Sequence, residues 1–336
     1  MKKFKNKKAI IIGFGGMGKR YYKALKSLGF KVSHICDKNE NNNKVIHKIN
    51  FVKNYKKLLN VNADLLCIVT NTTDRFTILA DFLKFSPIKR IITEKPLSCS
   101  LIEAFTLEKL IKKNKKKVII NSYRNLLRNY KQIIDILKKN NEDLKSINII
   151  SPSAGLGNMG SVFFDLSLYL FKEKPVSVYC KIDKNNTINP RGKKFKDPGG
   201  YGLVNFKNNK RLFFDLSEDT GLPYTMILKS KNYEFIIDEI NNNFFYKKKP
   251  SKFDSKPLFY YLFNPEYKKL RVFERYNPVN FTKKSIEEIF KQSFKSNINT
   301  SIETMKIIIG CHFSSKQNKE IKIIDKRMSN IRVPFA

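Results

Sequence analysis

The stretch Gly13-Phe14-Gly15-Gly16-Met17-Gly18 decides the fold of the first third of this chain. It follows an apolar run from Lys8 to Ile12, and it opens an amphipathic segment that ends at Gly29. Glycines spaced as Gly-x-Gly-x-x-Gly between a strand and a helix are typical of the first unit of a dinucleotide-binding sheet. The stretch therefore predicts a strand, a tight turn and a helix over residues 8–28.

Each glycine of the turn has its own physical reason. Gly13 permits the tight turn, Gly15 lets the backbone approach a pyrophosphate, and Gly18 lets the helix pack close to the strand. The helix N-terminus offers free amide donors and the positive end of its dipole to the phosphates. We predict that residues 13–18 bind the cofactor. The alternative is a glycine-rich turn that binds nothing.

Asp37 ends the next predicted strand, Lys31 to Cys36, about 20 residues beyond the turn. A carboxylate at this position accepts hydrogen bonds from the adenosine ribose and repels a 2′-phosphate, so NAD is favoured over NADP. Lys38 follows directly and softens that repulsion, and we include it among the cofactor-binding residues. The alternative for Asp37 is a residue that only closes a strand.

The rest of the first 122 residues alternates strands and helices, as a parallel sheet wrapped by helices does. Ser100 and Glu103 form a capping box that begins one helix. The pattern predicts a doubly wound Rossmann domain over residues 1–122. Its further elements are strands at 65–69, 90–93 and 118–121, a short helix near 45–49, a helix through Phe76, Leu79, Ala80 and Leu83, and a helix over 100–113.

Residues 123–336 have a different pattern, which predicts a second α/β domain with an open, mostly antiparallel sheet. Several strands joined by turns are expected between 176 and 246, after a strand at 145–150. The turn Asp197-Pro198-Gly199-Gly200 is interpreted as only a turn. Helices are expected around 130–139, 162–171, 284–294 and 301–314.

The bulk composition limits the classes of function. A net charge of +37 fits either the A- and T-rich codons of lysine, asparagine and isoleucine or a basic surface that attracts anions. Neither the spacing of a zinc finger nor an aromatic RNA-binding signature is found, so no dedicated nucleic-acid binding is expected. No apolar stretch is long enough for a membrane span or a signal peptide, which favours a cytoplasmic protein without a membrane partner.

The five cysteines are widely spaced, and they favour neither a disulfide framework nor a metal site. Cys36 and Cys67 fall in predicted strands and are expected to be small buried residues.

A second motif, Thr93-Glu94-Lys95-Pro96-Leu97, follows the predicted strand at 90–93. In open α/β sheets ligands bind beyond the carboxyl ends of the strands, where Lys95 emerges. A partly buried lysine there can hydrogen-bond a substrate hydroxyl and, with a lowered pKa, move a proton.

These motifs together resemble the Gfo/Idh/MocA family of sugar, inositol and sugar-nucleotide oxidoreductases. The resemblance covers nearly the whole chain and also includes Ile68-Val69-Thr70-Asn71-Thr72, Tyr123-Arg124 and Gly160-Ser161-Val162-Phe163-Phe164-Asp165. It implies a Rossmann domain, a C-terminal domain with an open antiparallel sheet, and a homo-oligomer (dimer or tetramer) paired through that sheet.

The resemblance also implies roles for particular residues. Lys95 and Asp165 become catalytic candidates that also contact substrate. Arg124 is either a ligand for a substrate carboxylate or phosphate or an ordinary surface arginine. The further implied residues are Thr70, Asn71, Thr72, Glu94 and Lys95 for the cofactor and Tyr123 with Arg124 for the substrate.

Tyr169 is the main departure from the family pattern, which has a histidine four residues after the aspartate. Tyrosine, with a reference pKa of about 10, is a poor base near neutrality. Lys95 and Asp165 suffice, or Tyr169 acts as an acid, or the site has lost its chemistry. The three histidines, at positions 34, 47 and 312, are not expected near the crevice.

The leading hypothesis is an NAD(H)-dependent oxidoreductase that acts on a secondary hydroxyl or ketone of a sugar-like substrate, with Lys95, Asp165 and Tyr169 as the proton-handling candidates. The alternative is a dinucleotide- or sugar-binding protein without turnover.

Overall fold

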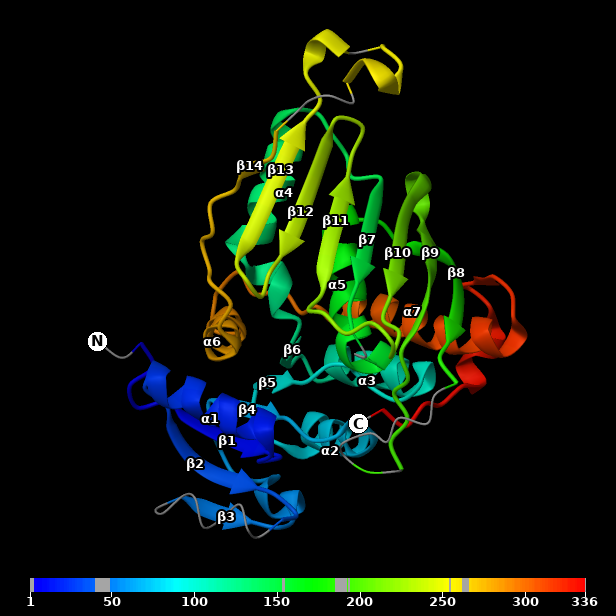
Figure 1. Ribbon diagram of the computed structural model, residues 1–336. Helices are drawn as coiled ribbons and strands as arrows, with labels where there is room; N and C mark the ends of the chain where they lie inside the picture. The colour runs from blue at the N-terminus through cyan, green and yellow to red at the C-terminus, as the bar shows by residue number, and fades with distance from the viewer. Residues whose placement is uncertain are drawn as a thin grey trace.

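The computed structural model describes residues 3–39, 49–152, 155–184, 192, 194–253, 255–261 and 266–335. It contains a six-stranded parallel sheet with helices and a nine-stranded, mostly antiparallel sheet. In Figure 1 the N-terminal sheet (blue to cyan) lies below the C-terminal sheet (green to yellow), with α3 and α7 between them. The α/β fold class predicted from the sequence is confirmed.

The first sheet has the order β3-β2-β1-β4-β5-β6, and every neighbouring pair is parallel. The order reverses between β1 and β4, which is where open α/β sheets bind ligands. The strand β3 was not predicted because three half-exposed residues carry no periodic signal. The strands are β1 (Lys8–Ile12), β2 (Lys31–Cys36), β3 (Asn50–Val52), β4 (Leu65–Ile68), β5 (Arg90–Thr93) and β6 (Lys117–Ile120). The helix expected near 45–49 lies almost wholly outside the described residues.

The helices of the first 122 residues that cover this sheet are α1 (Gly16–Leu28), α2 (Thr72–Phe85) and α3 (Leu101–Lys113). Gly29 ends α1 in the left-handed conformation with φ of 95°, as predicted. At α3 the Ser100 hydroxyl accepts the Glu103 amide, but the Glu103 carboxylate accepts the amide of Cys99. The predicted capping box is therefore formed in part: the Glu103 carboxylate binds the amide of Cys99 instead of that of Ser100.

The second sheet has the order β14-β13-β12-β11-β7-β10-β9-β8-β15. Only β7 and β10 pair in parallel among its described strands. Its strands are β7 (Ser146–Ile150), β8 (Pro175–Ile182), β9 (Gly200–Phe206), β10 (Lys210–Asp215), β11 (Thr225–Lys229), β12 (Tyr233–Asp238), β13 (Asn243–Lys248), β14 (Lys268–Lys269) and β15 (Ile321–Lys322).

The helices after residue 122 are α4 (Arg128–Lys139), α5 (Ser161–Phe171), α6 (Pro278–Glu288) and α7 (Ile298–Gln317). The prediction of a helix over 284–294 was wrong at both ends. Asn277 caps the amides of Val279 and Asn280 and Pro278 occupies the first turn, so α6 begins six residues earlier than predicted. Short helical turns lie at Tyr55–Leu58, Tyr123–Leu126, Gly155–Gly160, Lys207–Asn209, Ser251–Phe253, Leu258–Tyr261 and Lys326–Asn330.

The segment around α6 packs on the first sheet although it comes late in the chain. Ile286 and Ile289 belong to the same apolar cluster as Tyr21 and Leu25 of α1. Asn297 exchanges two hydrogen bonds with Ile120, one at 2.9 Å and one at 2.7 Å, and thereby covers the outer edge of β6. The domain boundary between 122 and 123 stays a prediction, since the chain returns to the first domain here.

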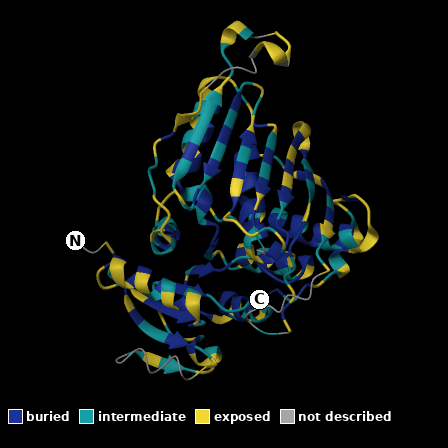
Figure 2. Ribbon diagram, viewed as in Figure 1, coloured by how far each residue is buried: buried dark blue, intermediate teal, exposed yellow. Residues whose placement is uncertain are grey.

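Burial follows the layers of both sheets. In Figure 2 the central strands of the first sheet are mostly dark blue, whereas the strands of the second sheet alternate buried residues with intermediate and exposed ones. Cys36 and Cys67 are buried, as expected. Within the described residues, every helix is too short or too polar to cross a membrane. The homo-oligomer stays a prediction; Ile150, Tyr201 and Phe213 are exposed apolar residues on strands of the second sheet.

The two glycines at the start of α1 predict opposite responses to alanine. A Cβ on Gly18 would lie 2.2 Å from the carbonyl oxygen of Gly13, whereas one on Gly16 meets nothing within 4 Å. We expect Gly18→Ala to lower the free energy of unfolding by about 1–3 kcal/mol, because helix and turn must separate. Gly16→Ala should raise the free energy of unfolding or leave it unchanged, because alanine is a better helix former than glycine. Denaturant unfolding of both variants checks this, and equal losses would contradict it.

Candidate active site

A cleft of about 610 Å³ lies at the carboxyl ends of the first sheet's strands and is lined by residues of both halves of the chain. The first half contributes the glycine turn and the loops after β2, β4 and β5. The second half contributes Asn158, Met159, Val162 and Tyr276. Predicted residues that line the cleft are Gly13, Gly15, Gly16, Met17, Asp37, Lys38, Thr70, Asn71, Glu94, Lys95, Tyr123 and Arg124.

The glycine turn has the geometry that a dinucleotide pyrophosphate requires. Gly13 has φ of +91°, a conformation that favours glycine, and its amide donates to Cys36 at 2.8 Å. A Cβ added at Gly15 or Gly16 meets no atom within 4 Å, so the turn leaves room for a ligand against its backbone. The first turn of α1 contains no acidic residue that would repel a phosphate. Across the cleft, the buried Thr70 hydroxyl has no hydrogen-bond partner in the described part of the chain.

Two residues of the predicted turn do not line the cleft. Phe14 is buried, and its ring makes an edge contact with Tyr22. Gly18 is packed beneath Gly13. These residues shape the turn from behind, and only the Phe14 amide takes part in the site, through Asp37.

Asp37 connects the end of β2 to the glycine turn. One carboxylate oxygen accepts the Phe14 amide, and the other accepts the Asn39 amide at 2.8 Å. Lys38 forms an exposed 3.0 Å ion pair with Asp74 in the first turn of α2. Lys38 thus forms its ion pair with Asp74 and not with Asp37.

Arg75, which the sequence analysis missed, joins the loops after β4 and β5. This buried side chain donates to the carbonyl of Thr70 at 2.7 Å and to the carbonyl of Pro96. It also donates to the hydroxyl of Thr72 at 3.1 Å, and Thr72 itself is buried and does not line the cleft. The guanidinium therefore fixes the spacing between the two loops.

Glu94 is a buried structural link that reaches the cleft wall. Its Oε1 accepts the Tyr21 hydroxyl at 2.9 Å and the Asn121 amide at 2.7 Å. The side-chain oxygen of Asn121 in turn accepts the Ser285 hydroxyl at 2.7 Å. Glu94 thereby ties together α1, the end of β6 and α6.

Lys95 is half-buried directly after β5, and its peptide bond to Pro96 is cis. Its ammonium donates to the carbonyl oxygen of Asn158 at 2.7 Å and to the side-chain oxygen of Asn158 at 2.8 Å. Burial lowers the pKa of Lys95 to about 8; Glu94 and Asp197 oppose this change, and Arg124 and Arg75 add to it. The amine therefore changes protonation state close to neutral pH.

Arg124 lies at the inner wall and is fully enclosed. It donates to one Glu239 oxygen from Nε at 3.0 Å and from Nη2 at 2.6 Å. Tyr224 and Tyr130 also donate to this carboxylate, the latter at 3.0 Å. The interpretation as a surface arginine is wrong, because both charges are buried and paired. Its neighbour Tyr123 stacks on Phe281 of α6.

Asp165 is buried in α5, one turn beyond Val162 of the cleft wall. Burial raises the pKa of its carboxyl to about 7, and a hydrogen bond with Ser122 acts in the opposite direction. Its Oδ1 has no hydrogen-bond partner among the described residues. The structure thus places Asp165 behind the cleft wall, in a setting that allows it to gain or lose a proton near neutrality.

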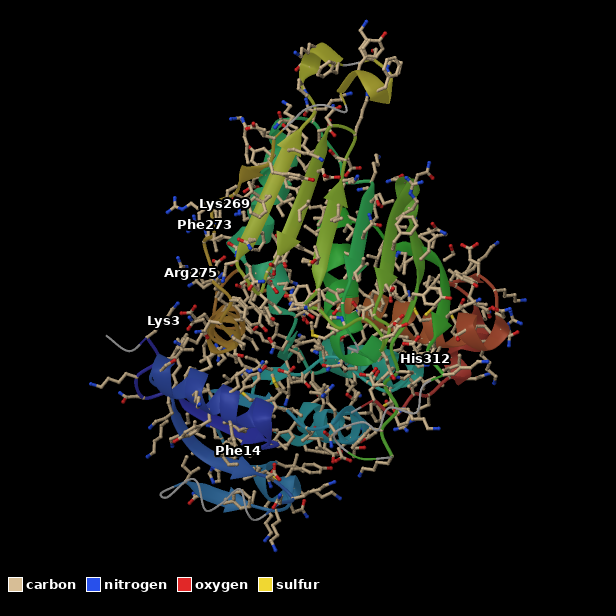
Figure 3. The ribbon with its side chains drawn as sticks, viewed as in Figure 1. Lys3, Phe14, Lys269, Phe273, Arg275 and His312 are labelled. Atoms are coloured by element: carbon tan, nitrogen blue, oxygen red, sulfur yellow. The ribbon has the colours of Figure 1, made fainter. Side chains whose placement is uncertain are left out.

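Tyr169 lies one turn further along α5 and does not line the cleft. It is half-buried, and burial together with the Asp135 charge on α4 raises its pKa. Of the described histidines, His34 and His312 do not line the cleft either. Figure 3 places His312 on α7, far from Phe14 of the glycine turn. His47 lies outside the described residues.

Asn158 and Asp197 are further residues that the sequence analysis did not assign to the site. Asp197 was interpreted as part of a simple turn, yet its carboxylate accepts the amides of Gly157 at 2.6 Å and Asn158 at 2.8 Å. The signal available in the sequence was weak: an acidic residue in a Pro-Gly-Gly turn, and an asparagine in a glycine-rich loop. Only the fold brings the two together.

Residues 7–122 match the family model GFO_IDH_MocA, described as an oxidoreductase family with an NAD-binding Rossmann fold. This match assigns residues 7–122 to a class of oxidoreductases with an NAD-binding Rossmann fold. The match confirms the predicted resemblance to the Gfo/Idh/MocA family over these residues, which make up about a third of the chain. A search of curated proteins finds no match.

Solved structures share the fold over nearly the whole chain. UDP-N-acetylglucosamine 3-dehydrogenase from Acidithiobacillus ferrooxidans is 13% identical with a TM-score of 0.75, covering 94% of this chain and 99% of that one. Levoglucosan dehydrogenase in complex with NADH is 12% identical with a TM-score of 0.77, covering 94% and 98%. A protein described as an NADPH-dependent oxidoreductase from Desulfitobacterium hafniense is 13% identical with a TM-score of 0.75, covering 95% and 98%. At these identities the likeness establishes the fold.

Proposed function

We propose that the chain is an NAD(H)-dependent oxidoreductase acting on a secondary hydroxyl, or the matching ketone, of a sugar or sugar-nucleotide. The observation that carries this proposal is the position of Lys95: a half-buried amine with a pKa of about 8 in the same cleft as the glycine turn. Among the solved structures of this fold, levoglucosan dehydrogenase is bound to NADH and levoglucosan in one and to NADH and L-sorbose in another.

The chain's own residues would hold the cofactor at two places, the glycine turn and the end of β2. The backbone of residues 15–17 would receive the pyrophosphate, and Asp37 would accept the ribose hydroxyls. When bound, the nicotinamide ring supplies the hydride chemistry. The open space at Gly15 and Gly16 supports this assignment.

Lys95 would handle the proton. An ammonium has three N–H donors, and Asn158 accepts two of them, which leaves one for a substrate oxygen. The aliphatic part of the opposite wall, with Met159 and Val162, would face the sugar. Asp165 lies one turn behind Val162 and supports this site through Ser122, which directly precedes Tyr123.

Replacing the amine separates binding from chemistry. We expect Lys95→Ala to bind NADH as the wild type does and to lose at least about 100-fold in kcat, the typical contribution of a general acid–base group. Fluorescence titration of NADH and turnover with a panel of keto-sugars and nucleotide sugars measure the two effects. Lys19→Ala, an exposed lysine of α1 outside the cleft, serves as the control. Full activity in Lys95→Ala would contradict the assignment.

The pKa of Lys95 predicts opposite pH profiles for the two reaction directions. Alcohol oxidation needs the neutral amine as a base, so kcat/KM should rise as the pH increases through about 8. Ketone reduction needs the ammonium as a donor, so the rate should fall over the same interval. Initial rates in both directions from pH 6 to about 10 measure this. Two profiles that move in the same direction would exclude Lys95 as the proton carrier.

The preference for NAD over NADP is part of the proposal. A 2′-phosphate would meet the Asp37 carboxylate, whereas the adjacent Lys38 is already paired with Asp74. We expect NADH to bind at least about tenfold more tightly than NADPH, and Asp37→Asn to reduce that ratio by removing the repulsion. Parallel titrations with both nucleotides check this. Tighter NADPH binding by the wild type would overturn the preference.

A second candidate function is dinucleotide binding without turnover. The observation that favours it is Tyr169, which stands where the resembling family has a histidine and which lies outside the cleft. NADH binding without consumption across the whole substrate panel would favour this function over catalysis.

A further inference from the structure

Asn158, which holds Lys95, is itself held by Asp197. The two carboxylate oxygens of Asp197 accept consecutive amides, from Gly157 at 2.6 Å and from Asn158 at 2.8 Å. The next residue, Pro198, accepts the amide of Leu156 at 3.0 Å. Three successive amides of the Gly155–Gly160 turn are thus bound by residues 197 and 198. The backbone carbonyl and side chain of Asn158 can then both turn toward Lys95.

Gly157 is also supported by the last described residues of the chain. Phe335 is fully buried, and a Cβ on Gly157 would lie 2.4 Å from its ring. The carbonyl of Pro334 accepts the amide of Lys196 at 3.0 Å, directly before Asp197. Residues 334 and 335 therefore brace both partners of the Asp197–Gly157 contact.

The same segment returns to the first domain and completes a closed chain of contacts. The amide of Val333 donates to the carbonyl of Cys99 at 2.9 Å, and Arg332 donates to Glu103 at 3.1 Å. Cys99 lies four residues after Lys95 in the same loop. The position of Asn158 relative to Lys95 is consequently fixed from both domains.

Asp197 has an electrostatic effect as well as a geometric one. Its charge raises the pKa of Lys95 and so opposes the effect of burial. A residue that served only to shape the turn would have no consequence for the protonation of that amine. This difference gives the test.

We propose that Asp197 is a positioning residue for Lys95: through the amides of Gly157 and Asn158 it fixes the two oxygens that receive the lysine ammonium. The proposal rests on the proposed function of Lys95. An asparagine at position 197 has an NH2 group in place of one of the two acceptor oxygens and carries no charge. In the observed geometry Asp197→Asn therefore leaves one of the two backbone amides facing a donor and removes the charge that favours the ammonium.

The experiment follows the reaction of the Lys95 amine with acetic anhydride as a function of pH, resolved by peptide mass spectrometry of the full-length protein. We expect Asp197→Asn to move the Lys95 titration to lower pH and to lower kcat about tenfold, because the amine is less well oriented. NADH affinity should stay within about twofold of the wild type, because the cofactor-binding turn is not touched.

Two further variants separate positioning from a purely structural role. Asp197→Glu keeps the charge, so its Lys95 titration should lie closer to the wild type than that of Asp197→Asn. If Asp197 only shaped the turn, neither variant would move the Lys95 titration. Asp325→Asn removes a carboxylate that also accepts a backbone amide, that of Arg327, but lies outside the cleft. It should behave as the wild type does.

A wild-type Lys95 titration in folded Asp197→Asn would overturn the proposal. If that variant does not fold, Asn158→Ala takes its place, since it removes one acceptor of the ammonium and should move the titration in the same direction. An unchanged titration in Asn158→Ala would likewise overturn the proposal. Absence of turnover in the wild type would refute the proposed function, while the labelling profile would still test Asp197.

Discussion

The two hydrogen bonds from the Lys95 ammonium to Asn158 join the halves of the molecule at the point where chemistry is proposed. The glycine turn positions a ligand relative to the first sheet only. Lys95 follows β5 of that sheet, but both of its acceptors belong to Asn158, in the part of the chain that forms the second sheet. The orientation of the amine therefore depends on how the two domains are held together, which makes the interdomain contacts part of the site.

Two buried arginines that line the cleft have partners on their own side of it. Arg124 is neutralised by Glu239, and Arg75 donates to loop carbonyls at the cleft wall. Removing one member of such a pair leaves a charge without solvation, which costs several kcal/mol. Both arginines are therefore held in place by their partners, and Lys95, whose pKa is about 8, is a cleft-lining group that can exchange a proton near neutral pH.

The parts predicted well from the sequence are those set by local pattern. The strands Lys8–Ile12, Lys31–Cys36 and Arg90–Thr93 were predicted at their observed bounds because buried parallel strands are nearly continuous apolar runs. The short β3 and the start of α6 were missed, because one has too few residues for periodicity and the other begins at an asparagine cap that apolar spacing does not reveal.

The site was predicted only where a motif marks it. The glycine turn and Lys95 stand in recognisable contexts, and both line the cleft. Arg124 was named, but its partner Glu239 lies 115 residues later and carries no sequence signal. Asn158 and Asp197 were missed for the same reason, since their contact joins a glycine-rich loop to a distant turn. Tyr169 was named because it lies four residues after Asp165. Only the fold shows that it does not line the cleft.

The cover that Asn297 gives to the edge of β6 has a consequence for how the chain is made. During synthesis the N-terminal residues emerge first and begin to fold first. The outer edge of β6 stays open until Asn297 leaves the ribosome, 177 residues after Ile120. The apolar face of α1 likewise stays uncovered until Ile286 of α6 has been synthesised. An open strand edge pairs readily with other chains, so the edge of β6 is exposed to aggregation while these 177 residues are made, about half of the 336 in the chain.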